Sequence, residues 1–166
     1  MTSKNINVPD MHNVSILMRR AIEAMILKLV FDVVEEKFSR DDAEKIIGKA
    51  WSRSAIDHGK QMAENFKDAP NLDNFAEILP NWTKEEALKI EILEQNADVM
   101  NFNVLKCRYS EMYKSMGLGD IGHLLSCNRD GDFCIGFNRD IEFTRTQTIM
   151  EGTSHCDFRY KLKSES

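Results

Sequence analysis

The sequence predicts an α+β domain in which a helical half precedes a half made mostly of strands with helices between them. Apolar residues recur at helical spacing in the first part of the chain and alternate at strand spacing in several later segments. The length of 166 residues and the hydrophobic content of 42% suffice for one core, and no repeat or linker divides the chain. We expect one domain over 1–166, mainly helical in 1–82 and sheet-forming in 83–166.

Three helices are expected in the first half. The first helix covers about 13–37, with an apolar stripe at Val14, Leu17, Met18, Ala21 and Met25. A second helix begins near Arg40, after the capping residue Ser39, and carries His58, which we interpret as a hydrogen-bonded core histidine. A third helix, 72–79, ends at a proline.

The segment 83–95 fits two structures. Thr83 would cap a helix, but the apolar residues of 88–92 alternate with charged ones, so a strand is favoured. Residues 100–104 alternate in the same way after a short turn, which predicts a hairpin.

Two further helices and two further strands complete the pattern. Residues 108–116 return to helical spacing and end at glycines. Residues 120–136 suit a helix capped by Asp120 or a hairpin with an Asp-Gly-Asp turn, and the helix is favoured partly on the resemblance described below. The segments 141–150 and 156–162 are expected to be strands.

Composition argues against several classes of protein. A net charge of -5 and a pI near 5.4 argue against a nucleic-acid partner. The longest apolar run, Met25 to Val34, contains Lys28 and Asp32 and is too short to span a membrane. The first residues do not look like a secretory signal, so we expect a cytoplasmic protein whose four cysteines are thiols.

The densest group of reactive side chains lies in the segment 120–136. If this segment is helical, one face carries His123, Cys127, Asp130 and Cys134. Such a face suits a thiolate nucleophile with acid and base groups, a metal bound by sulfur, imidazole and carboxylate, or simply the partly buried side of a helix. Because no Cys-x-x-Cys pair supports a metal, we expect no cofactor, and a divalent metal at these four residues is the alternative.

An inward-pointing arginine is expected in the strand 141–150. The alternation of this strand places Arg145 on its buried face, and Cys156 of the last strand faces the same interior. A buried guanidinium needs an anion. Arg145 would bind a ligand carboxylate, or it would form a structural ion pair with Asp130 or Glu111, and we give the two readings equal weight.

Other polar residues have less specific settings. Cys107 lies where a strand meets a helix, and Arg108 and Glu111 follow on one helix face near an expected pocket mouth. All three are candidate ligand contacts, and the alternative is a junction cysteine beside an exposed ion pair. Asp157 and Arg159 are expected to be cross-strand charges on a solvated or subunit-facing surface.

The last third of the chain contains four distinctive motifs: CRY at 107–109, CNRD at 127–130, TRT at 144–146 and G-x-x-x-CDFR at 152–159. Together they resemble the L-2-amino-thiazoline-4-carboxylate hydrolase family over 107–162. A helical half followed by an antiparallel sheet and a late Cys-x-Phe strand is more distantly similar to 4-vinyl-reductase-type ligand-binding domains. This second likeness implies a roughly four-stranded twisted antiparallel sheet packed by helices, two of them between the hairpins, and a homodimer.

The family resemblance implies a hydrolase of cysteine metabolism that acts on carbon–nitrogen bonds of a cyclic amidine. It would open 2-amino-thiazoline-4-carboxylate, a small anionic heterocycle, to a carbamoyl-cysteine. Arg145 would then anchor the carboxylate, Asp130 would hold the amidine, and Cys127 would attack it or shape the pocket for an attacking water. A nearby cation would lower the pKa of that thiol. The alternatives are a non-catalytic ligand-binding or sensor domain and a dimeric scaffold.

Overall fold

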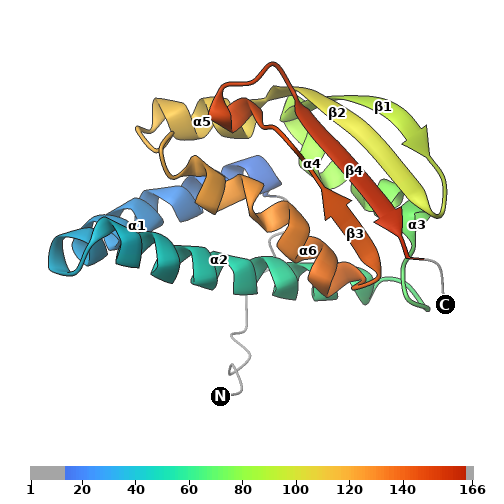
Figure 1. The fold of residues 1–166 in the computed structure, drawn as a ribbon, viewed down its shortest axis with the longest axis horizontal. Coiled ribbons are helices and arrows are strands. Elements are labelled where there is room, and N and C mark those ends of the chain that lie inside the picture. Colours follow the sequence, from blue (N-terminus) through green and yellow to red (C-terminus); the bar gives the residue numbers. More distant parts are fainter. Residues whose placement is uncertain (1–13, 164–166) are drawn as a thin grey trace.

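A computed structural model describes residues 14–163 as helices packed on one antiparallel sheet (Figure 1). The long helices α1 and α2 form an antiparallel pair, and α6 lies between α2 and strand β3. The strand order is β1-β2-β4-β3. The helices are α1 (Ile16–Lys37), α2 (Arg40–Ala63), α3 (Leu72–Ile78), α4 (Pro80–Thr83), α5 (Arg108–Ser115) and α6 (Arg129–Phe137), with short turns η1 (Lys84–Glu86), η2 (His123–Cys127) and η3 (Ile149–Glu151). The strands are β1 (Leu88–Gln95), β2 (Val99–Cys107), β3 (Ile141–Thr144) and β4 (Cys156–Leu162).

The predicted fold class is confirmed. The helical half comes first, the sheet has four antiparallel strands, and α5 and α6 lie between the β1–β2 hairpin and the β3–β4 pair. Within 120–136 the chain forms the π-helical turn η2 and then α6, and not a hairpin; Asp120 lies before both and caps neither of them. Within residues 14–163, no helix has both the length and the apolar character that a membrane crossing requires.

Two boundaries after α3 differ from expectation. Pro80 does not end helical structure, because proline is accepted at the first position of a helix and here begins α4. Residues 84–86 form a 3-10 turn in which Glu85 and Glu86 have φ angles of 57° and 53°. The strand expected over 83–95 therefore starts only at Leu88.

The strand expected over 141–150 ends at Thr144 because Asp157 binds the residues that follow. Asp157 Oδ1 accepts hydrogen bonds from the backbone N–H groups of Thr146 and Gln147, both at 2.9 Å. These two amides are therefore not free to extend the ladder. Arg159 donates to a backbone carbonyl and an asparagine side chain of β2, so neither residue forms the simple surface charge pair that the sequence suggested.

The buried face of α1 also differs from the predicted stripe. Met18 and Met25 were expected on the core side, but 55% and 63% of their surfaces are exposed. Because this helix is apolar almost all round beyond Met25, its periodicity does not identify the inner face. The side chains that α1 buries are Ile16, Leu17, Arg20, Ala24, Leu27 and Phe31.

Two glycines let α2 and α6 approach backbone to backbone. A Cβ atom at Gly59 would overlap the carbonyl oxygen of Phe133, and one at Gly136 would overlap the carbonyl oxygen of Ile56. No other residue type fits at these positions without a shift of a helix backbone. The contact fixes the position of α6, and with it the polar residues at the start of α6.

Gly59→Ala is expected to lower the free energy of unfolding by at least about 2 kcal/mol, because the added methyl group overpacks the contact. Gly48→Ala is the matched control in the same helix, since its new Cβ would meet only Leu124 Cδ2 at 3.7 Å. That change should stabilise the protein by up to about 1 kcal/mol through helix propensity. Urea unfolding followed by circular dichroism measures both values, and equal effects would contradict the close contact.

Candidate active site

A buried cavity with two lobes lies where the two clusters of the hydrophobic core meet. Each lobe has a volume of about 70 Å³. The lobes are adjacent, because they share a wall formed by Arg20 of α1, Trp82 of α4, Leu88 of β1, Arg129 and Asp130 of α6, and Phe158 of β4.

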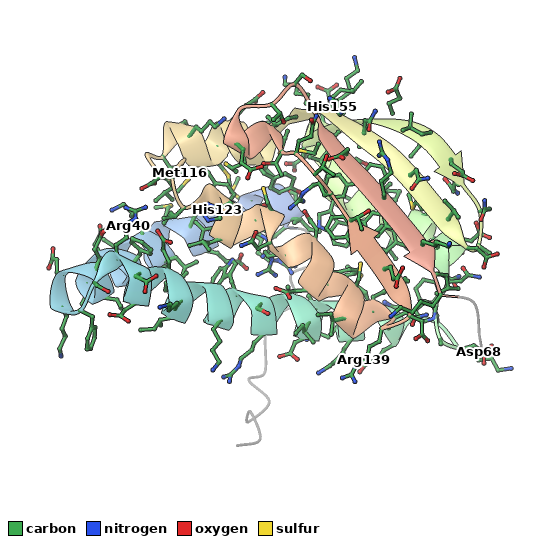
Figure 2. All side chains as sticks on the ribbon, in the orientation of Figure 1. Arg40, Asp68, Met116, His123, Arg139 and His155 are labelled. Atoms are coloured by element: carbon green, nitrogen blue, oxygen red, sulfur yellow. The ribbon has the colours of Figure 1, made fainter. Side chains whose placement is uncertain are left out.

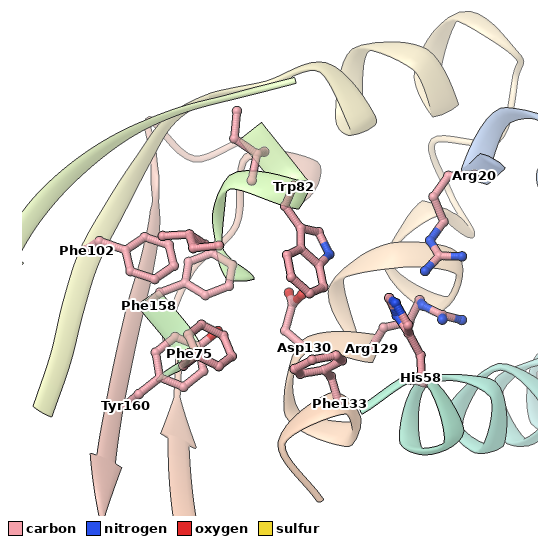
Figure 3. Close-up of a pocket in the computed structure, with 13 residues that line it drawn as sticks. Arg20, His58, Phe75, Trp82, Phe102, Arg129, Asp130, Phe133, Phe158 and Tyr160 are labelled. Carbon is pink, nitrogen blue, oxygen red and sulfur yellow. The ribbon is translucent and has the colours of Figure 1, made fainter. Parts of the chain in front are cut away.

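The first lobe is mostly aromatic. Figure 3 shows the rings of the sheet and of α3 on one side, Trp82 and Asp130 in the centre, and the basic side chains on the other side. Phe133 meets Trp82 at a near right angle, with ring centroids 5.2 Å apart. We call this space the aromatic lobe; besides the shared wall it is lined by Ala55, His58, Phe75, Leu79, Phe102, Phe133 and Tyr160.

The second lobe gathers three of the four cysteines. Cys107, Cys127 and Cys156 border it from β2, η2 and β4, together with Arg145. We call it the thiol lobe. Four of the residues that the sequence indicated as ligand or catalytic groups, Cys107, Cys127, Arg145 and Cys156, thus line the same space as Asp130.

Asp130 and Arg145 form an ion pair inside this cavity. Arg145 Nη1 donates to Asp130 Oδ2 at 2.6 Å, and Arg145 Nη2 donates to the backbone carbonyl of Cys127 at 3.0 Å. The guanidinium also lies over the rings of Phe143 and Phe158, 5.4 Å and 5.2 Å from their centroids. Both readings of Arg145 predicted a carboxylate partner, and the one present is that of Asp130.

Burial raises the pKa of Asp130 above the usual range, although the charge of Arg145 opposes the shift. The side chain lies deep in the protein yet keeps 30% of its surface accessible, because it faces the cavity. Among residues 14–163, hydrogen bonds reach only its Oδ2 atom, from Arg145. Asp130 Oδ1 therefore remains for a ligand or a water.

Arg129 and Arg20 were not anticipated, and both are buried at the shared wall. Arg20 is paired with Glu23 at 2.5 Å. The described part of the chain offers Arg129 no carboxylate within ion-pair distance; its Nη1 reaches only the carbonyl of Trp51, at 3.4 Å. Burial, together with the charge of Arg20, lowers the pKa of Arg129 to about 10. Arg129 thus carries a desolvated positive charge that an anionic ligand would neutralise.

His58 borders the aromatic lobe; a hydrogen-bonded core histidine was expected, but among residues 14–163 no hydrogen bond to its ring is found. Burial lowers its pKa to about 4, and the nearby charges of Arg20 and Arg129 act in the same direction. Its ring packs edge-on against Phe133 at 5.5 Å. The imidazole is therefore neutral at pH 7 and can donate or accept a hydrogen bond without adding charge to the cavity.

The thiols do not have the reactive character that was expected. Burial raises the pKa of Cys107 to about 11 and that of Cys134 to about 12, and it also raises the pKa of Cys127 and Cys156. Arg145 does lower the pKa of Cys127, but burial and the charge of Asp130 outweigh it. All four cysteines are free and protonated at neutral pH.

Four other candidates lie away from the cavity. Arg108 and Glu111 line a separate surface hollow beside α1, and Arg108 donates to the backbone carbonyl of Glu85. Cys134 is buried in the second hydrophobic cluster and lines neither lobe. His123 lies on η2 (Figure 2), outside both lobes.

The four residues of the suggested metal face are not brought together. The π-helical turn at 123–127 changes the residue spacing, so positions 123 and 134 no longer follow the regular stripe of an α-helix. Between residues 14 and 163, no group of three or more histidine, cysteine or acidic side chains is placed to hold a metal ion.

Comparisons with known proteins identify one sequence family and a likeness in fold. Residues 19–160 match the family described as L-2-amino-thiazoline-4-carboxylic acid hydrolase. None of the curated proteins compared matches the sequence.

Two solved structures were matched to the chain, and the first of them is similar in fold. The first is the phenol-responsive sensory domain of the transcription activator PoxR with phenol, at 12% identity and a TM-score of 0.52, covering 89% of this chain and 76% of that one. The second is an unliganded Fe(II) H-NOX protein from K. algicida, at 14% identity and a TM-score of 0.38, covering 79% of this chain and 67% of that one. At such identities the first likeness shows the fold alone.

Proposed function

Because this chain belongs to the L-2-amino-thiazoline-4-carboxylic acid hydrolase family, we propose that it is a hydrolase that opens 2-amino-thiazoline-4-carboxylate or a closely related cyclic amidine. The observation that carries the proposal is the pair of opposite charges at the shared wall of one buried cavity. Such a substrate needs a cation for its carboxylate and an anion for its amidine, and Arg129 and Asp130 are adjacent groups of these two kinds.

Arg129 replaces Arg145 as the proposed carboxylate anchor. The Arg145 guanidinium already donates to Asp130 and to the carbonyl of Cys127, whereas Arg129 has no carboxylate partner in the described chain. A planar guanidinium binds a carboxylate by two parallel hydrogen bonds, which would fix the orientation of the substrate. Arg20 lies at the same wall, but its charge is already paired with Glu23.

Asp130 is the proposed acid and base. Its Oδ1 would accept a hydrogen bond from the amidine, and a carboxylate with a raised pKa can take a proton from an attacking water. The water oxygen bonds to the amidine carbon, and its proton passes to Asp130. The ring bond from that carbon to nitrogen or sulfur then breaks, the leaving atom recovers the proton, and the product is a carbamoyl-cysteine containing one added water.

Cys127 is proposed to shape the thiol lobe rather than to attack. A thiol whose pKa is raised by burial is almost entirely protonated at neutral pH, and the thiolate is the nucleophilic form. This favours a water as the attacking group over the cysteine that the motif suggested.

A non-catalytic sensor or ligand-binding domain is the second candidate. It is favoured by the aromatic lining of the first lobe and by the fold likeness to the phenol-responsive sensory domain of PoxR. The two candidates differ in turnover, since only the hydrolase consumes its ligand.

The protein incubated with L-2-amino-thiazoline-4-carboxylate is expected to yield a product heavier by one water, measured by mass spectrometry. Asp130→Asn should lower kcat by about 100-fold or more. Arg129→Gln should mainly raise KM, whereas Cys127→Ser should keep activity within about tenfold. The matched control is Arg139→Gln, an exposed arginine beyond the end of α6 (Figure 2).

Three results of this experiment are informative. A thiol reagent tells which ring bond breaks, because only carbon–sulfur cleavage releases a thiol. Full activity of Asp130→Asn would contradict the assigned chemistry. Binding without turnover by the unaltered protein would favour the sensor candidate.

We also propose a homodimer through the exposed side of α1. This side carries Met18, Ile22, Met25, Ile26, Leu29 and Val33, which are all at least 48% exposed. Reversing the helix about the midpoint between Met25 and Ile26 exchanges Met18 with Val33 and Ile22 with Leu29. A twofold interface requires such a self-complementary patch, and a second antiparallel copy of α1 would supply it.

The double variant Ile22→Glu/Leu29→Glu is expected to convert the dimer to a monomer of 19.1 kDa, because it places charges in the centre of the stripe. Sedimentation equilibrium measures the mass. Ile92→Glu, which adds the same charge to an exposed position on β1, is the control and should leave the dimer intact. A monomeric unaltered protein, or an unchanged double variant, would contradict the proposed interface.

A further inference from the structure

A second surface hollow, with a volume of about 230 Å³, lies next to the buried cavity. It shares His58 with the aromatic lobe and Ile16 with the thiol lobe, so these two side chains stand between the hollow and the two lobes. We call it the outer hollow. An engineered cavity of about 150 Å³ holds benzene, so the outer hollow has room for a small ring.

The outer hollow is positively charged. Arg19 of α1 and Lys84 of η1 line it, and no carboxylate of residues 14–163 does. Glu85 lies nearby, but its carboxylate accepts a hydrogen bond from the Ser15 hydroxyl at 3.0 Å and does not line the hollow. Within the described chain the side chains of Arg19 and Lys84 form no ion pair, and Arg19 Nε is buried without a hydrogen-bond partner. An anion in the outer hollow would neutralise these charges.

Positive charge continues from the outer hollow to the shared wall. Arg19 and Arg20 are consecutive on α1, and the first lines the hollow while the second lines the wall. Glu23 neutralises Arg20, so the uncompensated charges are those of Arg19 and Lys84 outside and that of Arg129 inside. A cleft lined by charges of one sign raises the rate at which the opposite ion enters by about 10- to 1000-fold.

The His58 ring has the setting of a gate. Among residues 14–163 no hydrogen bond fixes it, and its ring neighbours are Trp82 and Phe133, with centroids 5.9 Å and 5.5 Å away. A rotation of the ring therefore breaks no hydrogen bond of the described chain, and rotamer changes near a surface are fast. Figure 3 shows the ring beside Arg129, on the side of the lobe away from the sheet.

We propose that the outer hollow is the entrance of the buried cavity, where Arg19 and Lys84 bind an incoming small anion and the His58 ring opens to let it pass to Arg129. The inference goes beyond the proposed function, because it assigns a route and three residues that touch neither reacting atom. It holds whether the cavity turns its ligand over or only binds it.

The thiols of the thiol lobe allow entry to be measured without turnover. Two methanethiosulfonate reagents of similar size serve as probes: the sulfonatoethyl reagent is an anion, and the trimethylammonioethyl reagent is a cation. Peptide mass spectrometry gives the rate at which each reagent modifies Cys107, Cys127 and Cys156, which line the lobe. Cys134 is the internal control, because it is buried and lines neither lobe, so its modification reports opening of the whole domain.

Arg19→Gln/Lys84→Gln is expected to lower the ratio of the anionic to the cationic rate at the lobe thiols at least about fivefold at low ionic strength, and less in high salt. Lys84→Glu, at an exposed side chain where the change should not disturb folding, is expected to lower the ratio as well. The matched control is Arg53→Gln/Arg139→Gln, which removes the same charge from two exposed positions outside the hollow and both lobes. This control should leave the ratio within about twofold.

His58→Ala tests the gate. Removing the ring is expected to raise the rates of both reagents at the lobe thiols by the same factor, at least about fivefold, with the Cys134 rate unchanged. His58→Phe keeps a ring of similar size and should not raise them. A parallel rise at Cys134 would assign the effect to opening of the whole domain and would overturn the gate.

The remaining outcomes separate this inference from the proposed function. An unchanged rate ratio in both charge variants, or unchanged lobe rates in His58→Ala, would overturn the entrance even if the protein opens the thiazoline ring. The expected rate changes without ring opening would support the entrance and remove only the hydrolase assignment.

Discussion

The buried ion pair between Asp130 and Arg145 is the interaction on which the site depends. Removing two charges from water costs several kcal/mol for each ion, and the pair is retained only because further contacts compensate. The carbonyl of Cys127 accepts a second hydrogen bond from the guanidinium, and the rings of Phe143 and Phe158 cover it. Asp130 is held at the start of α6, whose position depends on the glycine contact with α2. The geometry of the site therefore depends on the packing of α6 against α2.

The two lobes divide the work of the proposed site. The aromatic lobe would hold the ring of the substrate, and the protonated thiols of the thiol lobe would surround the atoms that react. The shared wall would supply the charged groups. This division explains why the cysteines can be numerous around a cavity without being nucleophiles. In such a site the carboxylate carries the chemistry, because its pKa is shifted toward neutral pH while those of the thiols are shifted away from it.

Some of this arrangement could be predicted from the sequence. Strand alternation placed Arg145 and Cys156 toward one interior, and the motif at 127–130 placed Asp130 near them, because these relations follow from local periodicity and from a family pattern. Arg20 and Arg129 could not be found in this way. Apolar residues lie almost all round α1, so its inner face was misassigned and Arg20 was not expected to be buried. Arg129 was not considered because its neighbour Asp130 was taken as the charged site residue of the motif. His58 was placed on the correct face of α2, but the cavity beside it exists only through long-range packing.

The most direct test of the account is the pKa of the Asp130 carboxyl, followed by carbon-detected NMR during a pH titration, with Asp130→Asn used to assign the signal. The account predicts a pKa above that of an ordinary aspartate, because burial outweighs the ion pair. It predicts a still higher pKa in Arg145→Met, because that variant lacks the cation that opposes the shift. With a raised folded-state pKa, the contribution of Asp130 to stability is fully present below its unfolded-state pKa and is lost as the pH rises through the folded-state pKa. A pKa at or below the ordinary value would show that Arg145 and solvent stabilise the charged form, and would contradict a desolvated carboxylate as the acid and base of this site.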